Sequence, residues 1–236
     1  MSLVRIDKLL ANRGLGSRSE IHRLIRKGRV AVNDQVITSR NSKFPHDSVI
    51  HLDGIAIGPL PLALAWHKPT NIISSMRDPL GRPDLATCLP AQWQGHFHPV
   101  GRLDRETSGL LLFSRSGALT QWLLHPRRAL RRWYEATVET SMDSEIVPRL
   151  AAGIETALGT FCARAEHVDG HFISLSVTEG KHRMLRRILA NSGHPVLTLH
   201  RVQYGPIQLG ELALDAVRPL LDSELTQLAA GGAPIE

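Results

Sequence analysis

A short apolar run that follows an acidic residue constrains the fold of this chain more than any other feature. Residues 101–113 read GRLDRETSGLLLF, with Asp104 just after Leu103 and ahead of the apolar run Leu110–Phe113. An apolar run of this length, bounded by glycine and serine, indicates a buried strand. A carboxylate at the mouth of such a strand loses hydration, which costs free energy unless an opposite charge pairs with it. Asp104 is therefore either half of a structural ion pair or a reactive group.

This string resembles the signature of bacterial pseudouridine synthases. More narrowly, it resembles that of the ribosomal small-subunit synthase and its large-subunit relatives. In that family the Asp of Gly-Arg-Leu-Asp is the catalytic nucleophile, so the resemblance assigns this role to Asp104. The family also shows a string in which Lys and Pro precede the catalytic region, and Lys68 and Pro69 match it. For Pro69 we favour a strand-ending turn.

Two further motifs are similar to those of the family. The string RRWYEA over residues 131–136 places Tyr134 at the phenol of the second motif, where a ring can stack on uracil or exchange protons. The third motif is EGKHRMLRRI over residues 179–188, where the resemblance aligns Leu185 with an apolar pocket residue and Arg186 with the basic partner of the catalytic Asp. Helical periodicity alone does not choose between Arg186 and Arg187, because both border the same apolar stripe. Relatives often carry Gln where this chain has Met184.

The resemblance implies that uridine is isomerised to pseudouridine. The bond from ribose carbon 1′ to uracil nitrogen 1 breaks, the base rotates, and carbon 5 takes its place. One carboxylate suffices, so we expect no cofactor and no metal. Attack on the ribose, attack on the uracil and elimination through a glycal all stay open. We expect Arg186 to keep Asp104 ionised, the base to be flipped into the pocket, and nearby cations to hold phosphates. These cations are Arg102, Lys181 and Arg183.

The first 53 residues form a basic module, with ten Lys or Arg against five Asp or Glu. Apolar spacing predicts a short helix at Ile6–Leu10, and a capping-box pattern at Ser17–Glu20 predicts a second helix. Alternating residues at Val30–Ile37 predict a hairpin, and Val49–Leu52 a further strand. These elements resemble an S-four (alpha-L) type RNA-binding domain. Its candidate RNA-binding residues are Arg5, Lys8, Arg18, Arg23, Arg26, Lys27 and Arg29.

The rest of the chain favours an α+β fold. Glycine and proline punctuate residues 54–63, and we assign a linker at 57–63 between an RNA-binding domain over 1–56 and a catalytic domain over 64–236. The order of elements favours a mixed, mainly antiparallel sheet with flanking helices over a doubly wound one. We expect strands at 64–67, 72–75, 110–114, 134–138 and 172–177, and helices at 116–124, 143–152, 181–192 and 222–230.

Composition narrows the setting. No apolar stretch approaches the roughly 20 residues that span a bilayer, and the N-terminus does not read as a signal peptide. Two cysteines without a Cys-x-x-Cys spacing fit the cytoplasm and argue against zinc. We therefore expect a cytoplasmic monomer that acts on ribosomal RNA or a pre-ribosomal particle. The exact uridine and the subunit stay open.

Two other functions were weighed. A non-catalytic RNA-binding or ribosome-assembly protein would share the basic module but would not need Asp104, Tyr134 and Arg186 together. A glycosidase would usually need two carboxylates about 5–9 Å apart. Glu106 is the nearest second candidate, and two residues beyond Asp104 we expect it to point elsewhere.

Overall fold

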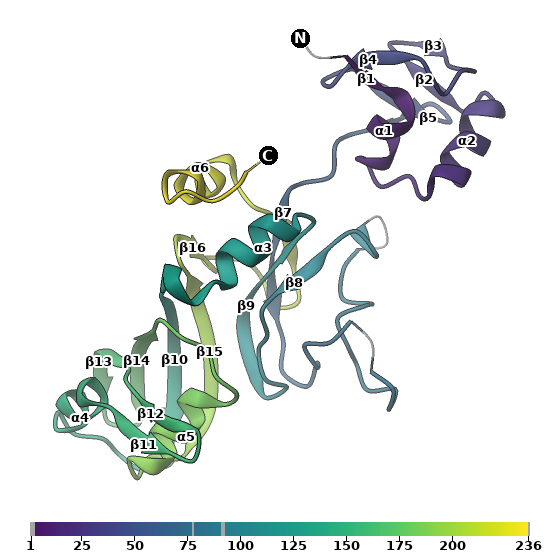
Figure 1. The fold of residues 1–236 in the computed structure, drawn as a ribbon. Coiled ribbons are helices and arrows are strands. Elements are labelled where there is room, and N and C mark those ends of the chain that lie inside the picture. Colours follow the sequence, from purple (N-terminus) through teal and green to yellow (C-terminus); the bar gives the residue numbers. More distant parts are fainter. Residues whose placement is uncertain (1–2, 77, 91–92, 236) are drawn as a thin grey trace. The chain divides into compact units, whose positions relative to one another are not determined.

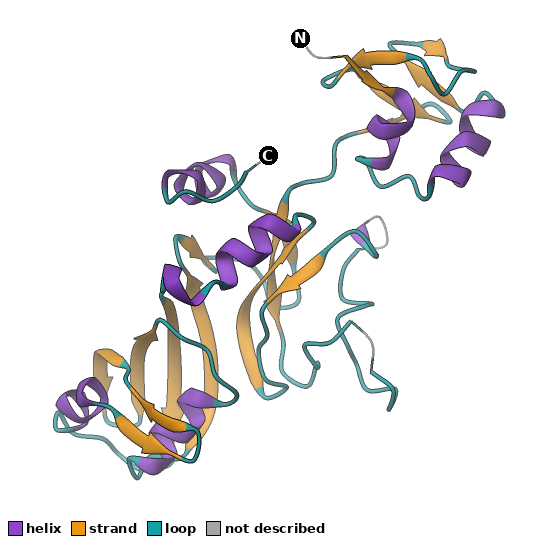
Figure 2. Ribbon diagram, in the orientation of Figure 1, coloured by secondary structure: helices purple, strands orange, loops and turns teal. Residues whose placement is uncertain are grey.

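The computed structural model describes residues 3–76, 78–90 and 93–235. The chain divides between Pro61 and Leu62 into two compact units, each of which has its own sheet (Figures 1 and 2). The expected linker at 57–63 is shorter than the sequence suggested, because Ile57 belongs to a strand of the first unit and Ala63 to a strand of the second.

The N-terminal unit combines two helices with short strands. Ser17 caps the second helix through the expected capping box with Glu20. The strands pair as a four-stranded sheet in the order β3-β2-β5-β6 and as the pair β1-β4. The elements are β1 (Leu3–Arg5), α1 (Ile6–Ala11), α2 (Arg18–Arg26), β2 (Val30–Val32), β3 (Gln35–Val36), β4 (Lys43–Pro45), β5 (Ile50–Leu52) and β6 (Ile55–Ile57).

A small core holds this unit together. The predicted apolar faces of both helices pack against the strands, with Ile6, Leu9, Ile21 and Ile25 almost fully buried. Arg13 is also buried and donates to the backbone carbonyls of Ser48 and Ile57 at 2.8 Å each. One of the basic residues of this module is therefore structural.

The second unit is built on a mixed, mainly antiparallel sheet, as expected. Among the described residues this sheet has nine strands. Seven of them follow one another in the order β13-β14-β10-β15-β9-β7-β17, while β16 pairs with β15 and β8 pairs with β9. Among the strand pairings that the structure describes in this sheet, only that of β9 with β15 is parallel. The strands are β7 (Ala63–Lys68), β8 (His98–Val100), β9 (Thr107–Ser114), β10 (Arg132–Val138), β13 (Arg164–Asp169), β14 (Phe172–Val177), β15 (Val196–Tyr204), β16 (Ile207–Gln208) and β17 (Val217–Pro219).

Helices and a hairpin flank this sheet. The helix α3 lies along β8 and β9, and α5 lies between β15 and the hairpin β11–β12 (Figure 1). The remaining elements are α3 (Gly117–Leu124), the 3-10 helix η2 (Pro126–Arg128), α4 (Ile146–Ala152), β11 (Ile154–Thr156), β12 (Gly159–Phe161), α5 (Met184–Asn191) and α6 (Asp222–Ala230).

Three expected elements differ from the structure. Residues 72–75 form no strand. Ile73 makes one isolated bridge to Asp84, and the Ser74 side chain binds the backbone of Leu103. The expected helix at 181–192 begins only at Met184, because Arg183 adopts a left-handed backbone conformation with φ of 50°. The expected helix at 143–152 begins at Ile146.

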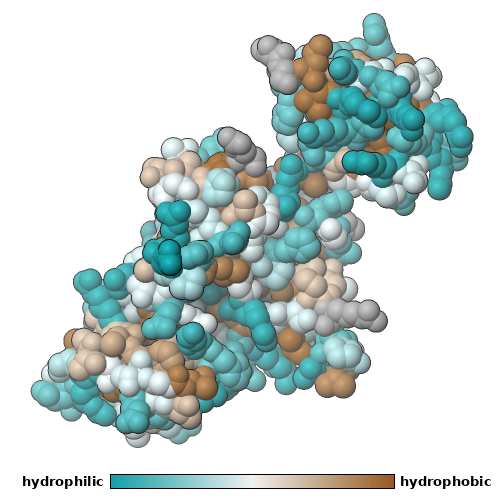
Figure 3. Space-filling model, viewed as in Figure 1, coloured by the Kyte–Doolittle hydropathy of each residue, from teal (hydrophilic) through white to brown (hydrophobic). Residues whose placement is uncertain are grey.

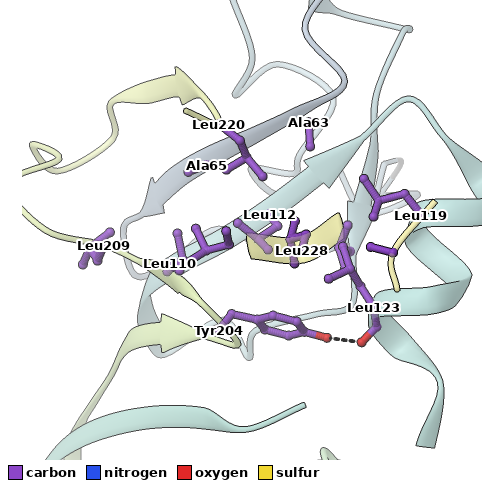
Figure 4. Close-up of a cluster of buried hydrophobic side chains, with 13 residues drawn as sticks. Ala63, Ala65, Leu110, Leu112, Leu119, Leu123, Tyr204, Leu209, Leu220 and Leu228 are labelled. Carbon is purple, nitrogen blue, oxygen red and sulfur yellow. Dashed lines mark hydrogen bonds between the residues drawn. The ribbon is translucent and has the colours of Figure 1, made fainter. Parts of the chain in front are cut away.

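A leucine-rich core lies between β7, β9 and the helices α3 and α6 (Figure 4). Leu110 and Leu112 of the predicted buried strand belong to it, with Leu123 of α3 and Leu228 of α6. Tyr204 closes this core and donates its hydroxyl proton to the Leu123 carbonyl at 2.7 Å. The apolar run after Asp104 therefore anchors the loop that carries this residue.

Candidate active site

The loop that carries Asp104 connects β8 to β9 and is held by the segment after β7. The Ser74 hydroxyl donates to the Leu103 carbonyl at 2.6 Å and accepts from the Leu103 amide at 3.0 Å. The Asn71 amide donates to the Arg105 carbonyl at 2.7 Å. Asp104 itself is half-buried. Its backbone is thus fixed on both sides by residues outside the motif.

Lys68 also holds this loop, through hydrogen bonds from its ammonium group to backbone carbonyls. Its side chain is fully buried, and its Nζ donates to the carbonyls of Pro69, Asp104 and Thr107 at 2.9, 3.3 and 3.0 Å. Burial lowers the pKa of Lys68 to about 8, and the nearby carboxylates of Asp104 and Glu106 oppose that shift. The sequence showed that Lys68 matches a family motif, but it did not indicate a structural or catalytic function for this residue.

Asp104 opens into a cavity of about 340 Å³. All seven residues that the sequence predicted for catalysis or for the pocket line this one cavity. They come from the loop, from β10, and from α5 with the segment that leads into it, which are far apart in the sequence. The seven are Arg102, Asp104, Tyr134, Lys181, Arg183, Leu185 and Arg186.

Other lining residues were not predicted. Thr107 is 2% exposed, and Leu199, Val177 and Met184 add apolar wall. Thr107 begins the strand that follows Asp104, and Leu199 comes from β15. Their apolar or small character carries no chemical signal in the sequence, so only the fold reveals them.

Arg186 does not form the expected direct ion pair with Asp104. Within the described part of the chain, the ion pairs shorter than 4.0 Å do not include these two side chains. The Arg186 guanidinium instead donates to the carbonyls of Glu106 and Val196 at 2.9 and 3.3 Å. Burial lowers the pKa of Arg186, and Arg183 adds to this, whereas the charges of Glu106 and Asp104 raise it.

Glu106 turns away from the cavity, as the sequence led us to expect. Its carboxylate pairs with the Arg183 guanidinium at 2.8 Å, and this hydrogen bond is the main reason why the pKa of Glu106 is lowered. Glu106 instead lines a neighbouring hollow on the other side of the loop. Glu106 therefore does not supply the second carboxylate that the glycosidase hypothesis requires. Besides Asp104, the described residues that line the cavity include one acidic residue, Glu179.

The candidate RNA-binding residues of the N-terminal unit are all exposed. Arg5, Lys8 and Arg18 surround a hollow that His22, Arg40 and Lys43 complete. Two of the seven are partly neutralised, since Arg5 pairs with Asp7 at 2.6 Å and Arg29 pairs with Asp53. Hydrophilic residues cover most of this unit on the face shown in Figure 3. The remaining predicted residues are Arg23, Arg26 and Lys27, on or just beyond α2.

The described residues contain neither a candidate metal site nor a candidate membrane-spanning helix. No group of three or more His, Cys, Asp or Glu is placed to hold a metal ion there. No helix among them has the length and apolar character to cross a membrane.

Two families of known proteins match this chain. The family profile of RNA pseudouridylate synthases matches residues 63–191, and that of the S4 domain matches residues 4–50. The chain therefore belongs to the RNA pseudouridine synthase family, whose members are isomerases of uridine in RNA, and it carries an N-terminal RNA-binding S4 domain.

Individual relatives cover nearly the whole chain. An RNA pseudouridine synthase of Aquifex aeolicus is 34% identical over 97% of this chain and 94% of its own length. The ribosomal large subunit pseudouridine synthase B of Bacillus subtilis is 31% identical over 96% of each chain. A crystal structure of a pseudouridylate synthase superposes with a TM-score of 0.66 at 25% identity, covering 95% of this chain and 99% of that one.

Proposed function

We propose that this enzyme converts a uridine of ribosomal RNA to pseudouridine, with Asp104 as the catalytic carboxylate. The observation that carries the proposal is the convergence of Asp104, Tyr134 and Arg186 on one cavity in a chain of this family. The relative from Bacillus subtilis is named for the large ribosomal subunit, which supports ribosomal RNA as the substrate.

The chemistry requires one nucleophile or base and no net change in composition. Asp104 attacks the ribose or the uracil, or abstracts a proton to start elimination, and the bond from ribose carbon 1′ to nitrogen 1 breaks. The base then turns and bonds through carbon 5, and the carbon 5 proton leaves while nitrogen 1 gains one. Asp104 is released unchanged, so no cofactor takes part in this scheme.

The charges around Asp104 suit this role. The cations of Lys68 and Arg186 both interact favourably with its carboxylate, without a direct ion pair. Backbone contacts fix the position of this carboxylate, and the two cations make no direct ion pair with it. Its oxygens therefore stay free to react. Arg186 also fixes the carbonyls of Glu106 and Val196, and so it holds the loop against β15.

A uridine within an RNA stack has to be flipped out to reach this cavity. Tyr134 and Leu185 supply a ring and an apolar side chain against which uracil can stack. Arg102, Lys181 and Arg183 lie at the same cavity, where they would hold the phosphates of the flipped nucleotide.

The exposed basic residues of the N-terminal unit bind the flanking RNA in this proposal. Their contribution is electrostatic and independent of sequence. We propose that the enzyme acts in the cytoplasm as a monomer, on free ribosomal RNA or on a pre-ribosomal particle.

Mapping of pseudouridines tests this function. The purified enzyme is incubated with transcripts of the small-subunit and large-subunit ribosomal RNA, and pseudouridine is located by carbodiimide modification and primer extension. We expect one defined site in one of the two transcripts with wild-type enzyme and none with Asp104→Asn. If neither free RNA is modified, the same assay on ribosomal particles from cells that lack the enzyme decides between the two substrates. Absence of activity on all of them would refute the proposal.

A further inference from the structure

A buried arginine lies beneath the candidate active site and has no acidic partner. Arg201 of β15 is 2% exposed, and among the described residues no ion pair involves it. A guanidinium stays charged at all accessible pH values, and burial of an unpaired charge costs free energy. A function that depends on the charge would account for an arginine at this position.

The position of Arg201 is fixed by the close approach of two strands. The strands β9 and β15 pair in parallel over three residues, and Arg201 faces Gly109 at the end of this pairing. A side chain on Gly109 would come within 2.3 Å of the Arg201 carbonyl oxygen, so the strands are in direct backbone contact there. The Arg201 Nε donates to the Leu110 carbonyl at 2.7 Å, and this bond directs the guanidinium.

The guanidinium lies between the only two tyrosines of the chain. Its carbon is 5.3 Å from the ring centroid of Tyr204 and 6.0 Å from that of Tyr134. Its Nη1 donates a long hydrogen bond of 3.4 Å to the Tyr134 hydroxyl oxygen, and Nη2 is buried without a partner. Tyr134 is the register partner of Arg201 on β10, so both side chains lie on the same face of the sheet.

The two tyrosine hydroxyls are used differently. The Tyr204 hydroxyl donates to Leu123 and accepts from Arg132 at 3.1 Å, so it is occupied within the core. The Tyr134 side chain lines the cavity, and Arg201 supplies its hydrogen bond within the described residues. A phenol has one proton to donate and can accept from other donors. When Arg201 donates to its oxygen, the proton of Tyr134 has to point away from Arg201.

We propose that Arg201 is a positioning residue for the reaction. Its charge holds the Tyr134 hydroxyl so that the proton of the phenol is directed into the cavity, toward the uracil. Hydrogen bonds at catalytic groups are often long without substrate and shorten in the complex, which fits the 3.4 Å contact. This inference rests on the proposed synthase function and adds to it a residue that does not line the cavity.

A double-mutant cycle tests the proposal. Single-turnover rates and the KM for RNA are measured for wild type, Arg201→Met, Tyr134→Phe and the double variant. Removal of a positioned acid or base group typically costs a factor of about 10² or more. We expect each single variant to lose a similar factor in rate, with KM for RNA unchanged within about twofold, because Arg201 is buried away from RNA. We expect the double variant to be no slower than Tyr134→Phe alone.

Other outcomes separate the proposal from its alternatives. Equal loss on Arg201→Met in the wild-type and Tyr134→Phe backgrounds would mean that Arg201 acts only through the fold, and the proposal would be wrong. A fully active Tyr134→Phe would also overturn it, while the proposed function would stand on Asp104. If Arg201→Met does not fold, Arg201→Lys takes its place in the cycle, since it keeps the cation but not the fixed geometry. Tyr204→Phe is the matched control, and we expect it to lower stability but not the rate.

Discussion

The candidate site concentrates buried cations around the loop that carries Asp104. Lys68 and Arg201 are almost fully buried, and neither has a carboxylate partner within ion-pair distance among the described residues. Both donate instead to backbone carbonyls close to the Asp104 loop or to its strand. At the scale of residues, positive charge therefore surrounds the loop, and the burial of these cations costs desolvation free energy.

The buried ammonium of Lys68 predicts a pH dependence of stability. Its pKa of about 8 in the folded protein lies below the value of about 10.4 for a lysine in an unfolded chain. Between these values the unfolded chain binds a proton that the folded protein lacks, so the free energy of unfolding rises with pH. Compared with Lys68→Met, the wild type should therefore gain stability from about pH 8 to about pH 10. Urea melts over this range measure the difference, and a constant difference would contradict the assignment.

The two arginines of α5 should differ in their effect. Arg186→Ala leaves the carbonyls of Glu106 and Val196 without their donor, which should cost about 1–3 kcal/mol, and it removes a cation that faces Asp104. The Arg187 side chain does not line the cavity, so the Arg187→Ala variant should keep the activity of the wild type. Denaturant melts and rates on both variants decide. An inactive Arg187→Ala beside an active Arg186→Ala would show that the third motif is assigned one residue out of register.

At this scale the sequence predicted which residues meet but not how they contact one another. All seven residues that were predicted from the family motifs line one cavity. Proteins of one family share a fold, so residues that match its motifs in the same order occupy the same places in that fold. Periodicity placed Arg186 at the border of a helix, and from there a guanidinium reaches carbonyls as readily as a carboxylate. Lys68 lies in a string that resembles the family, but the burial of its charge, like that of Arg201, cannot be read from a single sequence.

At the scale of elements, the junction of β9 and β15 organises the site. These strands form the parallel pairing that joins Asp104, just before β9, to Tyr134 through β15 and β10. The apolar run predicted β9, but its start at Thr107 and the strand β15 were not predicted. The segment LTLHRVQY alternates imperfectly, and a strand buried on part of its length gives a weak signal.

Gly109 should be sensitive to any side chain. Gly109→Ala places a Cβ 2.3 Å from the Arg201 carbonyl oxygen at a φ of 104°, so the strands must separate. Gly193→Ala has a similar φ of 94° but meets nothing within 4 Å, so it controls for backbone strain alone. We expect Gly109→Ala to lose at least about 2 kcal/mol more than Gly193→Ala in denaturant melts. Equal losses would contradict the close approach of β9 and β15.

At the scale of the whole molecule, charge and catalysis lie in different units. The boundary at Pro61–Leu62 separates the basic N-terminal unit from the unit that holds the cavity. The excess of basic residues, which the sequence shows over residues 1–53, ends close to this boundary. The expected linker was too long by a residue at each end, since the apolar residues Ile57 and Ala63 pair in strands rather than mark a loop.

Removal of residues 1–61 should weaken RNA binding and reduce its salt dependence. Each phosphate contact that is lost lowers the slope of log affinity against log salt by about 0.7–0.9. The second unit has its own core, so we expect the truncated chain to fold, which circular dichroism checks. Filter binding at salt concentrations between about 50 and 200 mM measures the slope, because the affinity for nucleic acid changes strongly over this range. An unchanged slope would show that the basic surface for RNA lies in the second unit.

The central claim is that Asp104 performs the chemistry while other groups bind the RNA. Release of tritium from ribosomal RNA that carries 5-tritiated uridine, measured for wild type and Asp104→Asn together with RNA affinity, tests it most directly. We predict that Asp104→Asn loses at least about 10³-fold in rate, since a neutral amide replaces neither a nucleophilic nor a proton-abstracting carboxylate, and that its affinity stays within about threefold. Activity of Asp104→Asn within tenfold of the wild type would contradict the account.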